Sequence, residues 1–232
     1  MNDFFAALRW LTPIALGEKE AEEQEPPALS TVLPWLPMVG MLLGFSLFAT
    51  TVVTAFLSPM LSALLVLGGW LSLGGMRHAM GLALTVSNHA SQEGEQAAFA
   101  GILSLIFLLL AKWVMLTLII EEGAWAALLL IPVWTLIGAI WWGNHVDADA
   151  QGDLTEMMQA SDGLIEKYLP WLFALWGVTF FVTDGLWLAP LALYGVLWLM
   201  HRIGGLMQMK LLGAGIEMCE VMLLLAVCIM MG

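Results

Sequence analysis

Three charged residues lie within apolar segments long enough to cross a bilayer, where ionised side chains are costly. Lys112 stands in "LLLAKWVML", and Glu217 and Glu220 stand three residues apart in "GAGIEMCEVMLLL". A helix would place both acids on one face. Lys112 either extends towards the external interface or pairs with one of these acids. The acids themselves form either a functional site, as intramembrane charges usually do, or a structural contact between helices.

A second group of polar residues follows an apolar run in "GGMRHAMGLALTVSNH", from Gly74 to His89. This stretch holds an arginine, two histidines, a serine and an asparagine, but no carboxylate. Arg77 and His78 are expected to anchor a helix end at the membrane interface. The other histidines show no metal-ligand spacing, and no Walker loop, HExxH or CxxC motif is present. The residue types therefore predict no metal site.

The composition excludes an ordinary soluble domain. Hydrophobic residues make up 61% of the 232 residues, and the mean hydropathy is +0.90. Several apolar runs reach the roughly 18 to 20 residues that cross a bilayer. The net charge of −12 resides largely in "GEKEAEEQEPP" and "DADAQGDLTEMM", which we interpret as solvated loops, and no nucleic-acid partner is expected. Cys219 and Cys228 lie in the last apolar segment and are expected to be buried thiols.

These features predict an all-α fold, a polytopic integral membrane helix bundle of about seven transmembrane helices in one domain, residues 1–232. Residues 1–16 are expected to form an interfacial helix, 17–33 an acidic cytoplasmic linker and 34–232 the transmembrane bundle. We place the spans at 35–57, 60–76, 97–120, 124–142, 168–183, 186–201 and 211–231. The fifth and sixth are short, and one broken helix in their place would leave six spans. Gly40 and Gly44 in "GMLLG" are spaced for close helix packing.

The positively charged residues indicate the orientation. With a cytoplasmic N-terminus, those outside the spans all fall on the cytoplasmic side: Arg9, Lys19, Arg77, Lys167, Arg202 and Lys210. The opposite loops carry no Lys or Arg, and Lys112 lies within a span. We therefore predict a cytoplasmic N-terminus and an external C-terminus.

Several short motifs occur in the order that one known family shows. "RWLTP" and "PMVGMLLG" are similar to its F-L-T and P-L-V-G-x-x-x-G motifs. "GMRHAMGLALTVSN" is similar to G-G-x-H-L-D-G-L-A-D-x-x-D-G and keeps His78, and "GILSLIFLLLAK" ends on the family's lysine at Lys112. Near the end of the chain, Arg202 precedes "GGLMQMKLLGAGIEMCE", which retains the family's Glu217 and Glu220. The chain thus resembles, over nearly its whole length, the bacterial cobalamin synthases, which are adenosylcobinamide-GDP ribazoletransferases. The resemblance implies the bacterial cytoplasmic (inner) membrane.

The resemblance also implies a metal-dependent phosphoester transferase, in which carboxylates hold a divalent cation against phosphates. The family's three motif aspartates fall on Met80, Leu84 and Ser87, and its C-terminal aspartate falls on Lys210. Met and Leu cannot ligate a hard cation, and Lys210 is predicted to pair with Glu217 instead. Glu93 and Glu95, on a short connection, are the remaining candidates to replace the aspartates. We thus predict no bound metal but an intramembrane polar cluster of Lys112, Arg202, Lys210, Glu217 and Glu220.

Three functions remain open. The main hypothesis is a degenerate, non-catalytic protein without a cofactor, which acts as a subunit or scaffold of a membrane complex. Its partners would be the lipid bilayer and other membrane subunits, or further copies of the chain. The first alternative is an active ribazoletransferase-like enzyme that requires Mg²⁺. The second is a small carrier, for which the spans offer few polar groups.

Overall fold

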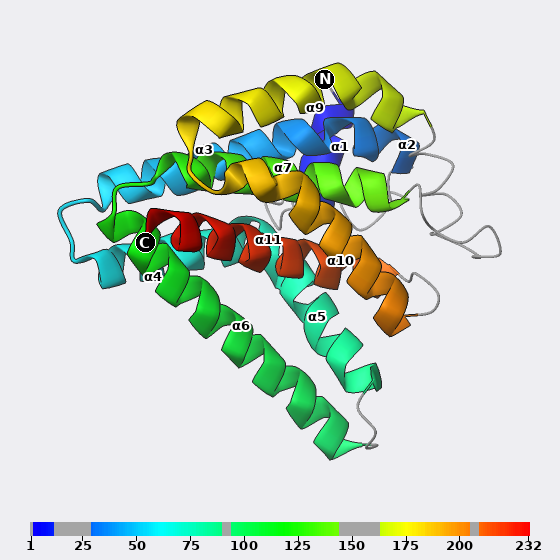
Figure 1. The fold of residues 1–232 in the computed structure, drawn as a ribbon. Coiled ribbons are helices and arrows are strands. Elements are labelled where there is room, and N and C mark those ends of the chain that lie inside the picture. The colour runs from blue at the N-terminus through cyan, green and yellow to red at the C-terminus, as the bar shows by residue number, and fades with distance from the viewer. Residues whose placement is uncertain (1, 12–28, 90–93, 144–162, 205–208) are drawn as a thin grey trace.

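The computed structural model describes residues 2–11, 29–89, 94–143, 163–204 and 209–232. The regular elements in these ranges are all helices, which confirms the all-α bundle (Figure 1). The longer helices are α1 (Asn2–Leu11), α3 (Leu36–Val53), α4 (Pro59–Trp70), α5 (Met76–His89), α6 (Glu95–Glu121), α7 (Ala126–Gly143), α9 (Leu164–Val182), α10 (Ala189–Gly204) and α11 (Met209–Met231). Short turns of helix precede α3, at α2 (Leu29–Val32) and η1 (Leu33–Trp35), link α4 to α5, at η2 (Leu71–Gly75), and precede α10, at η3 (Leu186–Leu188).

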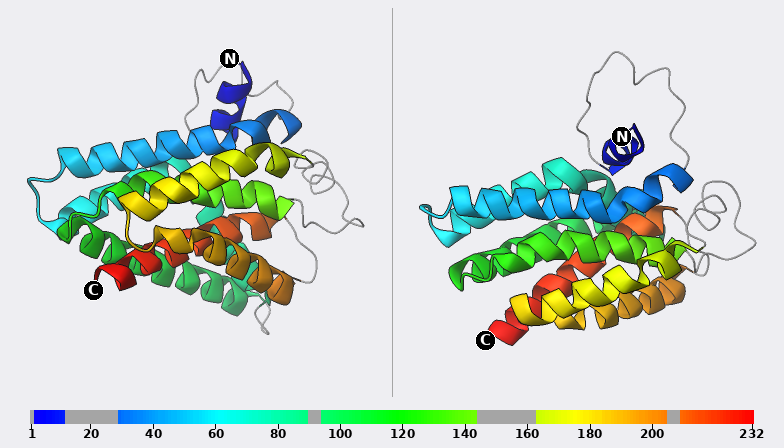
Figure 2. Two further views of the ribbon diagram at one scale, coloured as in Figure 1. Left: turned by 45° about the horizontal axis from the view of Figure 1, so that its top comes forward. Right: turned by 90° about the horizontal axis from the view of Figure 1, so that it is seen from above.

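The N-terminal helix α1 lies beside the start of the bundle, as both views in Figure 2 show. Phe4 of α1 meets the ring of Trp35 edge to face, with ring centroids 5.8 Å apart. The predicted interfacial helix is described from Asn2 to Leu11, and its remainder lies outside the described residues. The chain is helical again from Leu29, inside the segment predicted as a linker. Val32 and Leu33 are fully buried and bring this turn into the core.

Helices α3 and α7 pack with almost no side chain between them at two glycines. A Cβ atom added at Gly44 would lie 2.1 Å from the carbonyl oxygen of Leu129, and one at Gly40 would lie 2.8 Å from that of Pro132. Only glycine allows backbones to approach so closely. The structure therefore confirms the packing predicted from "GMLLG".

The second predicted span, 60–76, ends at a sharp bend. Helix α4 ends at Trp70, a π-helical turn covers Leu71–Gly75, and the axes of Pro59–Gly74 and His78–Asn88 differ by 83°. Most of the polar stretch from Gly74 to His89 thus forms a helix of its own, α5. In Figure 1, α5 and α6 run side by side away from the layer that contains α3 and α7.

Three helical segments of the described chain are long and apolar enough to cross a membrane: Ser30–Val53, Glu95–Glu121 and Leu212–Met231. The bent α4–α5 pair would make a fourth, and Ala126–Trp142 is apolar but shorter. The predicted count of seven spans therefore stays a prediction. The predicted fifth and sixth spans correspond to α9 and α10, which are separate helices that run in opposite directions (Figure 2).

Helix α11 occupies the centre of the bundle, where it contacts α5, α6, α7 and α10. Its residues 212–217 are buried, and Ile216 and Cys219 are at most 2% exposed. Small residues make this possible, since a Cβ atom at Gly215 would lie 2.7 Å from the sulfur of Met200. The polar side chains of α11 are thereby held among four other helices.

Candidate functional site

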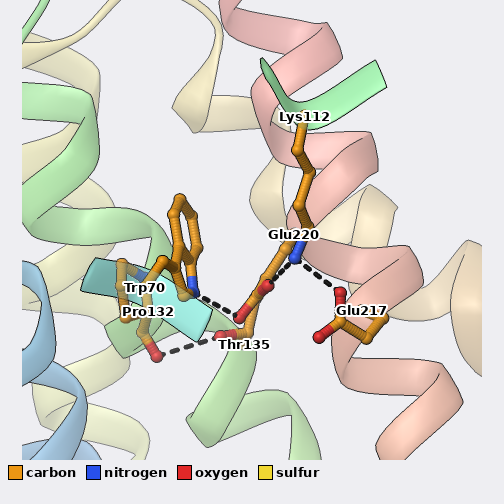
Figure 3. A network of polar contacts seen from close by, with 6 residues as sticks. All are labelled: Trp70, Lys112, Pro132, Thr135, Glu217 and Glu220. Carbon is orange, nitrogen blue, oxygen red and sulfur yellow. Dashed lines mark hydrogen bonds and ion pairs between the residues drawn. The ribbon is translucent and has the colours of Figure 1, made fainter. Parts of the chain in front are cut away.

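Lys112 and the two acids of α11 meet inside the bundle. The Lys112 Nζ donates to Glu217 Oε2 at 2.5 Å and also to Glu220 Oε2, from α6 to α11 (Figure 3). Lys112 is 1% exposed, Glu217 is fully buried and Glu220 is 5% exposed. Lys112 therefore does not extend to an interface but forms ion pairs with both acids. We call Lys112, Glu217 and Glu220 the buried triad.

The spacing of the acids explains this geometry. Glu217 and Glu220 are three residues apart, so α11 presents both on the face that meets α6, and one ammonium group reaches both. Helix α6 is in turn held close to α5 at Gly101, where a Cβ atom would lie 2.4 Å from the carbonyl oxygen of Ala83. Backbone packing thus brings Lys112 to a fixed place beside α11.

Trp70, the last residue of α4, completes the site. Its indole N–H donates to Glu220 Oε1 at 3.2 Å, and Lys112 Nζ lies 5.0 Å from the centroid of its ring, within range of a cation–π interaction (Figure 3). The sequence analysis did not identify Trp70. It is one of twelve tryptophans, and its only signal is its place between the apolar run and the motif that begins at Gly74.

The oxygens of the two acids differ in their hydrogen bonding. Both oxygens of Glu220 accept hydrogen bonds, one from Trp70 and one from Lys112. Glu217 accepts from Lys112 through Oε2, whereas its Oε1 is buried and has no partner. The triad contains one basic and two acidic side chains and so carries an excess of acid.

The degenerate motif lies on α5, and one member of it reaches the triad. A cavity of about 10 Å³ is lined by His78, Trp70, Thr135 and Glu220, among others. Thr135 donates to the carbonyl oxygen of Pro132 at 3.0 Å (Figure 3). His78, kept from the family motif, thus shares a cavity with Glu220.

The other motif positions face elsewhere or are engaged locally. Met80 is 57% exposed and Leu84 is 43% exposed, so both lie on the outer surface of α5. Ser87 Oγ donates to the carbonyl oxygen of Ala83, one turn earlier, at 2.9 Å. Glu95 is exposed in the first turn of α6, and Glu93 lies outside the described residues.

Three of the five residues of the predicted polar cluster meet in the described part of the chain. Arg202 is exposed near the end of α10 and lies over the ring of Trp198, 5.3 Å from its centroid, so it is not part of the triad. The side chain of Lys210 lies outside the described part of the chain, and its predicted pair with Glu217 therefore stays untested. The described partner of Glu217 is Lys112.

The donors at this site do not fit a hard divalent cation. Such a cation requires several oxygen ligands, and Mg²⁺ is especially strict about their geometry. Within the described ranges, no group of three or more His, Cys, Asp or Glu side chains is arranged to hold a metal ion. The Oε2 atoms of both acids already accept from the Lys112 ammonium group.

The family model described as cobalamin-5-phosphate synthase matches residues 3–228. The chain belongs to the cobalamin-5-phosphate synthase family. The match confirms the resemblance drawn from the motifs. Together with the apolar helices, it makes this chain a membrane protein.

Relatives from this family match the chain almost from end to end. An adenosylcobinamide-GDP ribazoletransferase of Laribacter hongkongensis is 32% identical over 97% of this chain and 96% of its own length. Proteins of the same name from Novosphingobium aromaticivorans and Thiobacillus denitrificans are each 28% identical, over 99% and 95% of this chain and 97% and 92% of their own lengths. No solved structure matches the chain.

Proposed function

We propose that this chain is a non-catalytic member of the cobalamin-5-phosphate synthase family, which acts by contact as a subunit or scaffold of an assembly in the bacterial inner membrane. One observation carries the proposal: the side chains at the motif positions that bear aspartates in the family. Met80 and Leu84 are apolar and exposed on α5, and the Ser87 hydroxyl is bonded to its own helix. Transfer at a diphosphate needs groups that hold and offset phosphate charge, and these side chains supply none.

The acids that remain are engaged in another role. Glu217 and Glu220 are paired with Lys112 inside the bundle, at most 5% exposed. Their charges therefore stabilise a contact between α6 and α11 and are not presented to a substrate. This arrangement supports a structural role for the triad, and we expect no requirement for Mg²⁺.

The exterior of the bundle supports action by contact. Large apolar side chains on α6 and α9 are exposed, including Phe107 at 65%, Phe173 at 68% and Phe181 at 86%. Such a surface suits lipid, and it equally suits a helix of another membrane protein, because helices associate in membranes by close van der Waals packing.

The first test is an assay of ribazole transfer to adenosylcobinamide-GDP by the purified chain in lipid nanodiscs with Mg²⁺ or Mn²⁺. The Laribacter hongkongensis relative, prepared in the same way, is the positive control. We expect product from the relative and none from this chain. Metal-dependent product from this chain would overturn the proposal in favour of the enzyme.

A variant with aspartates at the four motif positions tests whether the missing carboxylates are the cause of inactivity. It combines Met80→Asp, Leu84→Asp, Ser87→Asp and Lys210→Asp. If only this variant forms product, the missing carboxylates account for the inactivity of the natural chain.

The contact role is tested by photo-crosslinking in native membranes. A photoreactive residue replaces the exposed Phe181 on α9, and the same residue at the exposed loop position Glu122 serves as the control. We expect a discrete adduct with a membrane protein, or with a second copy, from position 181. Adducts with lipid alone from several exposed positions along α6 and α9 would contradict the subunit role.

A further inference from the structure

An apolar groove lies between α7, α9 and α10 at the surface of the bundle. Its volume is about 400 Å³, and large apolar side chains line it, among them Trp134 and Trp141 of α7 and Leu193 of α10. Helix α9 packs mainly against α7 and η3, whereas α10 packs mainly against α11. The groove is therefore the space that α9 and α10 leave between them beside α7. We call it the α9 groove.

The side chains of α9 that line the groove follow a helical spacing. Leu169, Leu172, Phe173 and Trp176 stand at positions i, i+3, i+4 and i+7, so they share one face of the helix. A face with this spacing is normally buried against another element. Here Leu169 is 44% exposed, Phe173 68% and Trp176 41%. The inner face of α9 is thus left open by the groove.

The size of the groove excludes a helix of another protein. Its lining extends from Trp134 to Trp141 on α7 and from Leu169 to Trp176 on α9, which is about 10 Å along each helix axis. A helix with its side chains would fill roughly 800 to 1,100 Å³ over that length, at least about twice the volume of the groove. Lipid hydrocarbon chains are thinner than a helix, uncharged and aligned with the spans. The groove therefore suits lipid chains.

Two cations lie at one end of the helices that form the groove. Lys167 is exposed in the first turn of α9, and Arg202 is exposed in the last turn of α10, over the ring of Trp198. Both views in Figure 2 place the start of α9 and the end of α10 at the same end of the bundle. With His201 neutral, the described charges of these two turns are two cations and one anion, Glu166. Basic side chains beside a space between membrane helices favour an anionic headgroup.

We propose that the α9 groove is a binding site for one anionic phospholipid. Its acyl chains lie in the groove against the open face of α9, and its phosphate contacts Lys167 and Arg202. The pattern of positive charges predicts that this end of the bundle is cytoplasmic, so the lipid comes from the inner leaflet. The proposal does not depend on whether the chain transfers ribazole or binds a protein partner.

Native mass spectrometry tests the site, because it resolves chains that carry one lipid from chains that carry none. The full-length protein in detergent is freed of lipid and titrated with phosphatidylglycerol, which is anionic, or with phosphatidylcholine, which has no net charge. We expect one phosphatidylglycerol per chain, bound more tightly than phosphatidylcholine. Lys167→Gln and Arg202→Gln should each weaken binding of phosphatidylglycerol about fivefold and leave that of phosphatidylcholine unchanged.

A variant that fills the groove tests where the chains lie. Leu172→Trp places a larger side chain in the groove and should weaken binding of phosphatidylglycerol by at least about tenfold. Leu110→Trp makes the same change at an exposed position on α6, outside the groove, and is the matched control. It should bind phosphatidylglycerol as the natural chain does.

A phosphatidylglycerol with a photoreactive group on one acyl chain locates the chain in the natural protein. We expect crosslinks concentrated in residues 134–141, 169–176 and 190–193. The proposal is overturned by absence of a one-lipid complex, by equal affinity for the two lipids, or by unchanged binding in Leu172→Trp. Crosslinks as frequent on the exposed face of α6 as in the groove would also overturn it, and this measurement decides the question even if Leu172→Trp does not fold.

Discussion

Lys112 Nζ lies 2.5 Å from Glu217 Oε2, although the two residues are 105 positions apart in the chain. The contact exists because α11 runs through the centre of the bundle and packs against α6. The same ammonium group also binds Glu220, so one cation holds two acids of neighbouring turns. Removing one member of this cluster leaves a buried charge without its partner, whereas removing all three members leaves none. The two kinds of variant should therefore differ in stability.

The first prediction concerns Lys112. Lys112→Met leaves two buried acids without their counter-ion and should lower the free energy of unfolding by roughly 3 to 5 kcal/mol. The combined variant Lys112→Met, Glu217→Gln, Glu220→Gln removes the charges together and should cost much less. Thermal unfolding in detergent measures both, in a background with the partly exposed Cys228 replaced by alanine and with a thiol-reactive dye that reaches the fully buried Cys219 only on unfolding.

Lys167→Met, at an exposed lysine in the first turn of α9, is the matched control and should change stability little. Equal losses in the single and the combined Lys112 variants would show that the ion pairs do not determine stability.

The second prediction concerns Trp70. Trp70→Phe keeps an aromatic ring but removes the N–H that donates to Glu220 Oε1, and hydrogen bonds to charged groups contribute about 1.5 to 3 kcal/mol. The same assay should show a loss of that size. Trp113→Phe removes an N–H that donates to the backbone carbonyl of Met60 and should cost less, about 0.5 to 1.5 kcal/mol. A larger loss for Trp113→Phe would count against the role of Trp70 in the site.

The third prediction concerns the close approach of α3 and α7. Gly44→Ala places a methyl group 2.1 Å from the carbonyl oxygen of Leu129, and backbone atoms cannot move aside as a side chain can. We expect a loss of about 1 to 3 kcal/mol, the usual cost of overpacking. Gly68→Ala on α4 meets nothing within 4 Å and should be neutral, or stabilising by up to about 1 kcal/mol. Similar stabilities for both variants would contradict the packing.

The fourth prediction concerns topology. In a background with Cys219 and Cys228 replaced by alanine, single cysteines at Glu122 or Asp184 should react with a membrane-impermeant thiol reagent added to intact cells. Cysteines at Gly94 or Gln151 should react only after the membrane is opened, because the positive charges place those positions in the cytoplasm. External labelling at Gly94 would reverse the predicted orientation.

Much of the fold follows from local sequence. Apolar length predicted the helices at α3, α6 and α11, since only a helix satisfies its own backbone hydrogen bonds within a bilayer. The four-residue spacing of Gly40 and Gly44 predicted a close helix contact, because small residues one turn apart let two helix backbones approach. The predicted end of the second span at residue 76 lies at the bend between Gly74 and His78, but the sequence analysis did not predict that the chain continues from there as a helix packed against α6 and α11.

The sequence by itself determined which residues could do chemistry: Lys112, Glu217 and Glu220 stand out because charges are costly in apolar helices, and Met80 and Leu84 stand out because they cannot replace aspartate. Only the tertiary structure decided how the charged groups combine. In the structure, Lys112 pairs with both acids and Trp70 donates to Glu220. Arg202 lies on the surface, over the ring of Trp198. Spacing along one helix shows which side chains share a face. The partner that a face meets depends on how α4, α6 and α11 pack, and that packing is set by contacts between residues far apart in the chain.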